Sequence, residues 1–328
     1  MELSTLAGND ALKRQLSRQA ARRGLSHAYL IGGPSGSGKR TLARLLGAAL
    51  VCEAGGEDAP CGRCPACKKA LKGIHPDVIR VAGEDGKDLT VAQLRAMRSD
   101  AYIRPNEAGR KVYVVENAQA MNPSAQNAIL KLLEEGPAYC AFLLLTDNPA
   151  AVLPTIRSRC EGVSLTPVSP REAEDYLLRT RPTADKQAVH AAALRCEGLI
   201  GRAVTELEGG GDDAPRESAR TLVGLFAKGD ELALAAFTVT LEKWDRSALT
   251  ALMDEGVLLL RDALALQSGG GADADPQRRA VAEGAAALPK SGLMRAVTAL
   301  EELRSAASFN VGGGHLCGAL AARLAQCR

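Results

Sequence analysis

Three things are scarce in this sequence of 328 residues: aromatic side chains, net charge and long apolar runs. Aromatic residues make up 3% of the chain, so we expect a core of aliphatic side chains. The 41 basic residues nearly balance the 38 acidic ones, and a net charge of +3 does not by itself indicate nucleic-acid binding. No apolar run approaches the ~20 residues that span a bilayer, and the N-terminus lacks a basic-then-apolar signal pattern. We therefore expect a cytoplasmic protein without a membrane partner.

The length predicts two or three domains, at the usual ~100–200 residues per domain. Short apolar runs at 28–31, 112–115 and 142–145 alternate with helical patterns and Gly/Pro turns. This alternation predicts a mainly parallel α/β sheet that binds its ligand at the carboxyl ends of the strands. From residue 169 onward the pattern is helical, and the glycine string at 209–211 is typical of a flexible hinge.

A glycine-rich stretch from Gly33 to Lys39 fits the G-x-x-x-x-G-K part of the Walker A pattern. It lies between an apolar run and a helical segment, where Gly33, Gly36 and Gly38 let backbone N–H groups surround a polyphosphate. The pattern requires Ser or Thr directly after the lysine as a Mg²⁺ ligand, but Arg40 stands there and Thr41 follows. The stretch therefore predicts binding of ATP or ADP and puts Mg²⁺ in doubt. The alternative is a glycine turn that never contacts phosphate.

A second motif follows the apolar run at 112–115. P-loop ATPases end this strand with an Asp for magnesium and often a Glu that activates water. Here the two positions are Glu116 and Asn117. Because an amide cannot take a proton from water, we expect this degenerate Walker B motif to lack a general base.

Four of the nine cysteines are close together in the sequence, and the other five are scattered. Cys52, Cys61, Cys64 and Cys67 have the spacing C-x8-C-x2-C-x2-C, which lets four thiolates surround one ion tetrahedrally. The spacing predicts a structural Zn²⁺ site with no open position for a catalytic water. Reduced cysteines without a metal are the alternative.

These stretches together resemble the bacterial DNA polymerase III clamp-loader subunits of the AAA+ class, and among them the delta-prime family. The resemblance covers roughly residues 5–205 and matches the tail only loosely, around 309–311. It is carried by the glycine-rich stretch, the four cysteines, His75-Pro76-Asp77, Lys111 to Glu116, Asn127 to Glu135, and Ser158-Arg159-Cys160.

The resemblance implies three domains: a RecA-like AAA+ domain at 1–165 with a zinc knot at about 52–67, a helical lid at 166–208 and an all-helical collar domain at 214–328. It also implies partners, namely the gamma/tau and delta subunits, the beta sliding clamp, and primer-template DNA through the complex. By the same resemblance, Arg159 is an arginine finger that acts in the ATP site of a neighbouring subunit. Arg202 falls where such proteins place a second nucleotide-sensing arginine.

Two alternatives stay open. The gamma/tau motor shares the zinc module and Ser-Arg-Cys, but it has Thr after the P-loop lysine and Asp-Glu at the second motif. An active motor would need Thr41 and Glu116 to serve magnesium here. The other alternative is a nucleic-acid-binding zinc module that uses the cationic stripe of Arg14, Arg18 and Arg22. The departures at Arg40 and Asn117 favour a stationary subunit that helps a neighbour hydrolyse ATP.

Overall fold

The computed structural model describes residues 1–83, 89–208, 213–270, 276–307 and 311–327. The chain divides into two compact units, Met1–Leu207 and Glu208–Arg328. The predicted hinge at 209–211 and residues 309 and 310 of the loosely matched tail lie outside the described residues. The three-domain division stays a prediction. Among the described helices, none is long and apolar enough to span a membrane.

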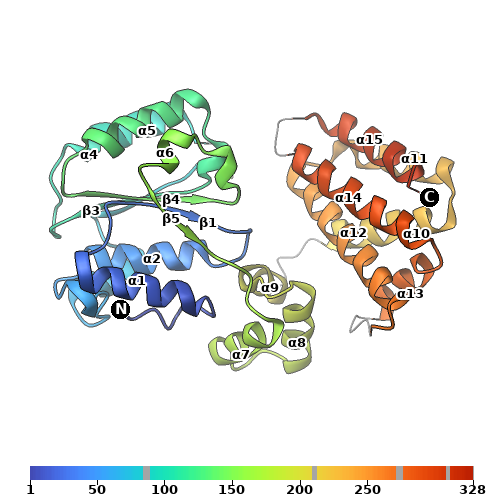
Figure 1. The fold of residues 1–328 in the computed structure, drawn as a ribbon, viewed down its shortest axis with the longest axis horizontal. Coiled ribbons are helices and arrows are strands. Elements are labelled where there is room, and N and C mark those ends of the chain that lie inside the picture. The colour runs from blue at the N-terminus through green and yellow to red at the C-terminus, as the bar shows by residue number, and fades with distance from the viewer. Residues whose placement is uncertain (84–88, 209–212, 271–275, 308–310, 328) are drawn as a thin grey trace. The chain divides into compact units, whose positions relative to one another are not determined.

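The first unit is built on a five-stranded parallel sheet with the order β2-β3-β4-β1-β5 (Figure 1). Its strands are β1 (Ala28–Gly32), β2 (Val78–Val81), β3 (Lys111–Val115), β4 (Cys140–Thr146) and β5 (Glu161–Ser164). β1 and β4 are buried along their whole length, as expected of parallel strands covered on both faces. The predicted parallel α/β fold is confirmed, and β5, which the sequence analysis did not predict, forms one edge.

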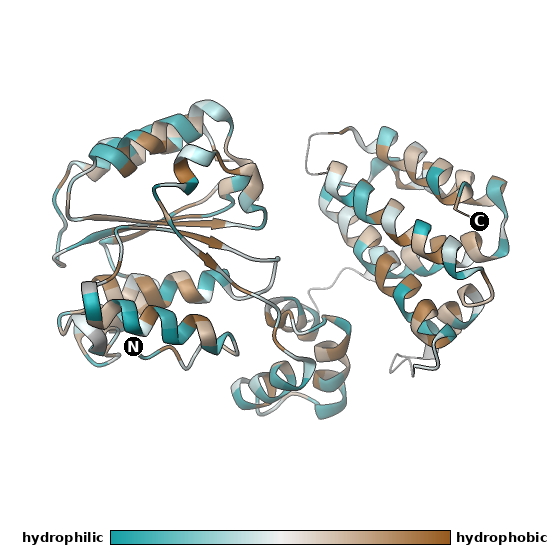
Figure 2. Cartoon of the chain, in the orientation of Figure 1, coloured by the Kyte–Doolittle hydropathy of each residue, from teal (hydrophilic) through white to brown (hydrophobic). Residues whose placement is uncertain are grey.

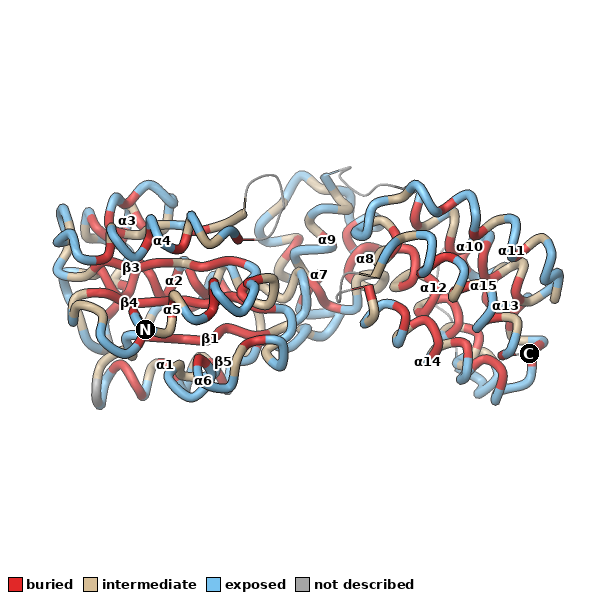
Figure 3. Tube along the Cα trace, turned by 90° about the horizontal axis from the view of Figure 1, so that it is seen from above, coloured by how far each residue is buried: buried red, intermediate tan, exposed pale blue. Residues whose placement is uncertain are grey.

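Helices cover both faces of this sheet (Figure 1). They are α1 (Asp10–Arg23), α2 (Lys39–Leu50), α3 (Pro65–Leu71), α4 (Val91–Ala101), α5 (Pro123–Glu135) and α6 (Pro154–Arg157). Leu16 of α1 and Leu42 of α2 belong to the core on one face, whereas Leu94 of α4 and Ile129 of α5 belong to the core on the other. Apolar strands lie between these helices, whose outer faces are polar and exposed (Figures 2 and 3). The sheet is therefore buried between two aliphatic layers.

The first unit ends in three helices, α7 (Pro170–Thr180), α8 (Lys186–Arg195) and α9 (Ile200–Leu207). They share a small core of their own around Leu177, Val189 and Ala203. Ser169 caps α7 in a capping box with Glu172. This three-helix segment occupies the part of the sequence where the lid was expected.

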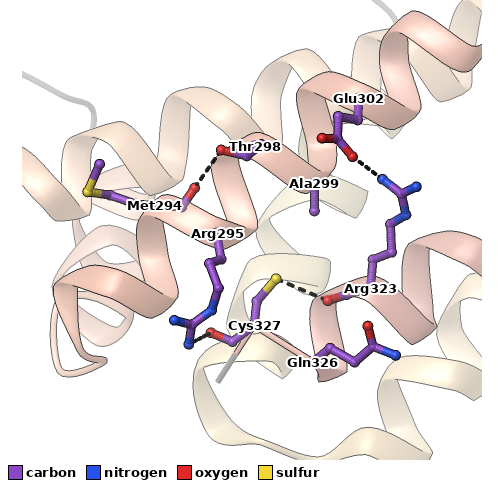
Figure 4. A pocket seen from close by; sticks show the side chains of 8 residues that line it. All are labelled: Met294, Arg295, Thr298, Ala299, Glu302, Arg323, Gln326 and Cys327. Carbon is purple, nitrogen blue, oxygen red and sulfur yellow. Dashed lines mark hydrogen bonds and ion pairs between the residues drawn. The ribbon is translucent and has the colours of Figure 1, made fainter.

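The second unit is all-helical in its described residues, as predicted. Its helices are α10 (Asp213–Lys228), α11 (Glu231–Thr240), α12 (Arg246–Gln267), α13 (Pro276–Ala285), α14 (Lys290–Ala307) and α15 (Gly313–Ala325). α12 packs against α10 and α14, and one aliphatic core includes Leu252, Leu260 and Leu300. A shallow groove of about 440 Å³ lies along α14 and α15, where Arg323 is paired with Glu302 (Figure 4).

The start of β2 is fixed by a buried carboxylate. Asp77 accepts hydrogen bonds from the backbone N–H groups of Asn106, Glu107 and Ala108, at 2.6, 2.8 and 2.9 Å. Burial raises the pKa of Asp77, but these backbone donors outweigh burial and hold the pKa below its ordinary value. The Asp of His75-Pro76-Asp77 therefore has a structural task, which is to hold residues 106–108 against β2.

We predict that Asp77→Asn lowers the free energy of unfolding by about 2–3 kcal/mol, because an amide turns a donor toward backbone N–H groups that need an acceptor. Urea denaturation measures the change. Asp175→Asn, at an exposed position of α7, is the matched control and should change stability by less than about 0.5 kcal/mol. Equal effects of the two substitutions would contradict the assignment.

Candidate functional site

The glycine-rich stretch forms the loop between β1 and α2, as predicted. Gly36 and Gly38 adopt φ values of 87° and 96°, which favour glycine. A Cβ on Gly33 would lie 2.7 Å from the carbonyl oxygen of Leu165. The loop therefore requires glycine for its backbone conformation and for close contact with its neighbours.

The Lys39 ammonium has an acceptor for each of its three hydrogens. Nζ lies 2.7 Å from the carbonyl oxygen of Gly33, 2.9 Å from that of Pro34 and 2.6 Å from Oδ1 of Asp147. Asp147 follows Thr146 of β4, which is paired with Gly32 of β1. Sequence reasoning did not identify Asp147, although an acidic residue directly after a buried strand was a visible signal.

The second motif forms an ion triad. Oε1 of Glu116 accepts from Nε of Arg80 at 2.7 Å, and Oε2 accepts from NH2 of Arg80 at 3.0 Å and from NH2 of Arg40 at 2.7 Å. The Glu116 side chain is 6% exposed, whereas those of Arg40 and Arg80 are 68% and 64% exposed. The residue after the P-loop lysine is thus paired with the residue at the end of β3. Arg80, a lone charge in an apolar strand, was missed from the sequence.

The Glu116 carboxylate is kept ionised by its partners. Burial raises its pKa, but the hydrogen bonds and charges of Arg80 and Arg40 outweigh burial and lower the pKa below the ordinary value. The next residue, Asn117, is exposed and has a left-handed backbone with φ 52°. Thr41 is half-buried on α2. The contact between α2 and Glu116 is made by Arg40.

The start of α9 lies against the glycine-rich loop at Gly36. The backbone N–H of Gly201 donates to the carbonyl oxygen of Gly36 at 2.9 Å. A Cβ on Gly36 would lie 2.9 Å from both the backbone nitrogen and Cγ of Arg202. The structure thus brings Arg202 to this loop, and its role as a second nucleotide-sensing arginine stays a prediction.

Arg159 lies just after α6 and before the amino end of β5, whereas the glycine-rich loop follows the carboxyl end of the parallel strand β1. Its NH1 donates to the carbonyl oxygen of Thr155 at 2.8 Å, and its NH2 is paired with Glu134 at the end of α5. The Arg159 side chain is 38% exposed. Its guanidinium is therefore held at the surface, away from the loop of its own chain that carries Lys39.

The four cysteines predicted to bind a metal come together. The sulfur atoms of Cys52, Cys61, Cys64 and Cys67 all lie within 4.8 Å of one another. A tetrahedral Zn²⁺ with Zn–S bonds of about 2.3 Å needs sulfur atoms roughly 3.8 Å apart, so the donor set fits this ion. Backbone N–H groups of Cys64 and Arg63 donate to Cys61 and lower the pKa of its thiol to about 6. Burial raises the pKa of the Cys67 thiol, which therefore needs a cation to become a thiolate.

A glycine loop between a central parallel strand and a helix, with a helical segment against the loop, defines a P-loop fold of the AAA+ class. The profile of the family described as "DNA polymerase III, delta subunit" matches residues 8–169. The DNA polymerase III subunit delta' of Bacillus subtilis is 30% identical over 250 residues, 75% of this chain and 74% of the relative. The chain therefore belongs to the family of DNA polymerase III clamp-loader subunits, and the resemblance seen in its sequence is confirmed.

Other similar proteins include delta' subunits and gamma/tau subunits. The delta' subunit of Pseudomonas aeruginosa is 34% identical over 189 residues, which are 55% of this chain and 58% of that relative. The tau subunit of Bacillus subtilis is 35% identical over 158 residues, which are 48% of this chain and 27% of that relative. Among solved structures, a gamma subunit-related protein from Thermotoga maritima is 17% identical with a TM-score of 0.46, covering 96% of this chain and 99% of that chain. Identity alone does not separate delta-prime from gamma/tau.

We predict an acid-dependent loss of stability that depends on Glu116. Because the folded pKa is lowered, the ionised carboxylate stabilises the fold above its unfolded pKa of about 4.3, and this contribution is lost as the pH falls through the folded pKa. The difference in unfolding free energy between wild type and Glu116→Gln should shrink between about pH 5 and pH 3. Denaturant titrations across this range measure it. Glu135→Gln, at an exposed position, is the matched control. A difference for Glu116→Gln that does not change with pH would refute the prediction.

Proposed function

We propose that this chain is the delta-prime type of clamp-loader subunit, a stationary member that helps a neighbour hydrolyse ATP without hydrolysing it itself. The observation that carries the proposal is the pairing of Arg40 with Glu116. In a hydrolysing P-loop protein, a hydroxyl and a carboxylate at these two positions serve magnesium. Here a guanidinium stands in place of the hydroxyl and occupies the carboxylate. Asn117 follows, so the position where many P-loop ATPases carry a general base holds an amide instead.

Arg159 would serve the neighbouring site. In the isolated chain, its guanidinium is paired with the partly exposed Glu134, and the side chain lies partly exposed at the surface. A guanidinium presents five N–H donors, so phosphate oxygens of a neighbouring subunit can bind it bidentately. The proposed partners are the gamma/tau and delta subunits, with the beta sliding clamp and primer-template DNA reached through the complex.

The four cysteines would hold one structural Zn²⁺. All four ligands come from the chain, so the ion would be closed to substrate and would stabilise the fold. The segment from Cys52 to Cys67 contains only the first residues of the short helix α3 and a single turn of 3₁₀ helix, Gly56–Asp58. So short a segment buries little apolar surface by itself, and metal binding would supply folding free energy in its place.

We predict that Arg159→Ala leaves this chain folded and able to assemble, yet lowers ATP turnover of the reconstituted complex. An arginine finger raises the rate of hydrolysis by about 10³–10⁵-fold at the ATP site that it serves. Total ATP turnover of the complex should therefore fall by the fraction that this one site contributes. Arg157→Ala, two residues earlier and exposed, is the matched control. Unchanged turnover with Arg159→Ala, or brisk hydrolysis by the isolated chain that Lys39→Ala abolishes, would favour the motor instead.

We predict that the purified chain carries about one Zn²⁺, which Cys64→Ser releases. Loss of the ion should lower the thermal midpoint by about 5–10 °C, since each 1 kcal/mol is worth about 2–4 °C in a domain of this size. Atomic emission spectrometry and calorimetry measure the two effects. Cys317→Ala, on α15, should keep its zinc. A chain that is metal-free as purified, and equally stable with and without a chelator, would contradict the assignment.

A further inference from the structure

The triad of Arg40, Glu116 and Arg80 does not fit a magnesium ion. Mg²⁺ requires near-octahedral coordination by oxygen at about 2.0–2.1 Å. Both oxygens of Glu116 already accept hydrogen bonds from guanidinium groups, at 2.7–3.0 Å. An ion at this carboxylate would have to displace two arginines and would meet their positive charge. The residues therefore argue against a metal beside the glycine-rich loop.

The triad nevertheless supplies what a magnesium ion supplies. Two guanidinium charges opposite one carboxylate leave a net charge of +1, the same as one Mg²⁺ ion with one carboxylate. Arg40 is the second residue of α2 and directly follows Lys39. Positive charge is thus kept at the N-terminus of α2, beside the Lys39–Asp147 pair, and a helix N-terminus attracts a polyphosphate.

Arg40 also has donors to spare. Its NH2 bonds to Oε2 of Glu116, while the side chain stays 68% exposed. A guanidinium has five N–H donors in a planar fork that matches two oxygens of a phosphate. Glu116, fixed by Arg80 from the neighbouring strand, orients this fork. Arg80 would then act as a positioning residue.

We propose that Arg40, oriented by Glu116 and Arg80, takes the place of Mg²⁺, so that this loop binds a nucleoside di- or triphosphate that carries no metal. The proposal rests on the nucleotide binding predicted from the glycine-rich stretch, and it is independent of Arg159. It makes Arg40 a specificity-determining residue: the departure from the Walker A pattern changes which form of the nucleotide is bound.

The test is a calorimetric titration of the full-length chain with ADP and with ATP, each in magnesium chloride and in excess EDTA. We expect the affinity in EDTA to stay within about threefold of that in magnesium, or to exceed it. Arg40→Thr should lower the affinity in EDTA by about 10–100-fold, the value of a charge-assisted hydrogen bond. Arg40→Lys, which keeps the charge but loses the fork, should fall between wild type and Arg40→Thr.

Arg44→Thr is the matched control, because Arg44 lies one turn later on α2 at an exposed position. It should bind like wild type, and circular dichroism should show all variants folded. A loss of more than about tenfold on removal of magnesium, equal affinities of Arg40→Thr and Arg44→Thr, or no nucleotide binding in either buffer would each overturn the proposal. These outcomes leave the proposed function standing, because that depends on turnover of the complex with Arg159→Ala.

Discussion

The arrangement of the residues beside the glycine-rich loop depends on one buried carboxylate, which needs charged partners. Glu116 is 6% exposed at the end of β3, and an ionised carboxylate taken out of water without partners is costly. Arg80 supplies two hydrogen bonds from β2, and Arg40 supplies one from α2. Substituting either arginine would weaken the compensation of this charge. The same contacts that satisfy the carboxylate also remove it from the set of available metal ligands.

The site contains two separate ion pairs, one made by Lys39 and one made by Arg40. Lys39 is directed to its own loop and to Asp147 after β4, whereas Arg40 is directed to Glu116 after β3. β4 lies between β1 and β3 in the sheet, so these two acidic residues stand at the ends of neighbouring strands. The two cations beside the loop, Lys39 and Arg40, are therefore each paired with a different acidic residue. Asn117, which follows Glu116, carries an amide that does not take a proton from water.

Structural features whose residues lie close together in the sequence could be predicted from it. The glycine loop and the clustering of the four cysteines were predictable from spacing alone, and the structure has both as expected. Residues that meet across the sheet were not predictable. Arg80 reaches Glu116 because Val81 is paired with Val115, and this register is not visible in a single sequence. β5 was missed because Val163 is the only apolar side chain in its four residues, and α6 was missed because it is only about one turn long.

Hydrogen bonds and close contacts to backbone atoms hold the three-helix segment, α7 to α9, against the rest of the first unit. Gly201 donates to Gly36, and a Cβ on Gly198 would lie 1.7 Å from the carbonyl oxygen of Val168. Asn9 also bonds through its side chain to the backbone of Thr166, at the entrance to this segment. Contacts of this kind are made at one relative position and are lost on a small rotation, because hydrogen bonds weaken steeply with distance and angle. A rotation of the three-helix segment relative to the sheet would therefore have to break them.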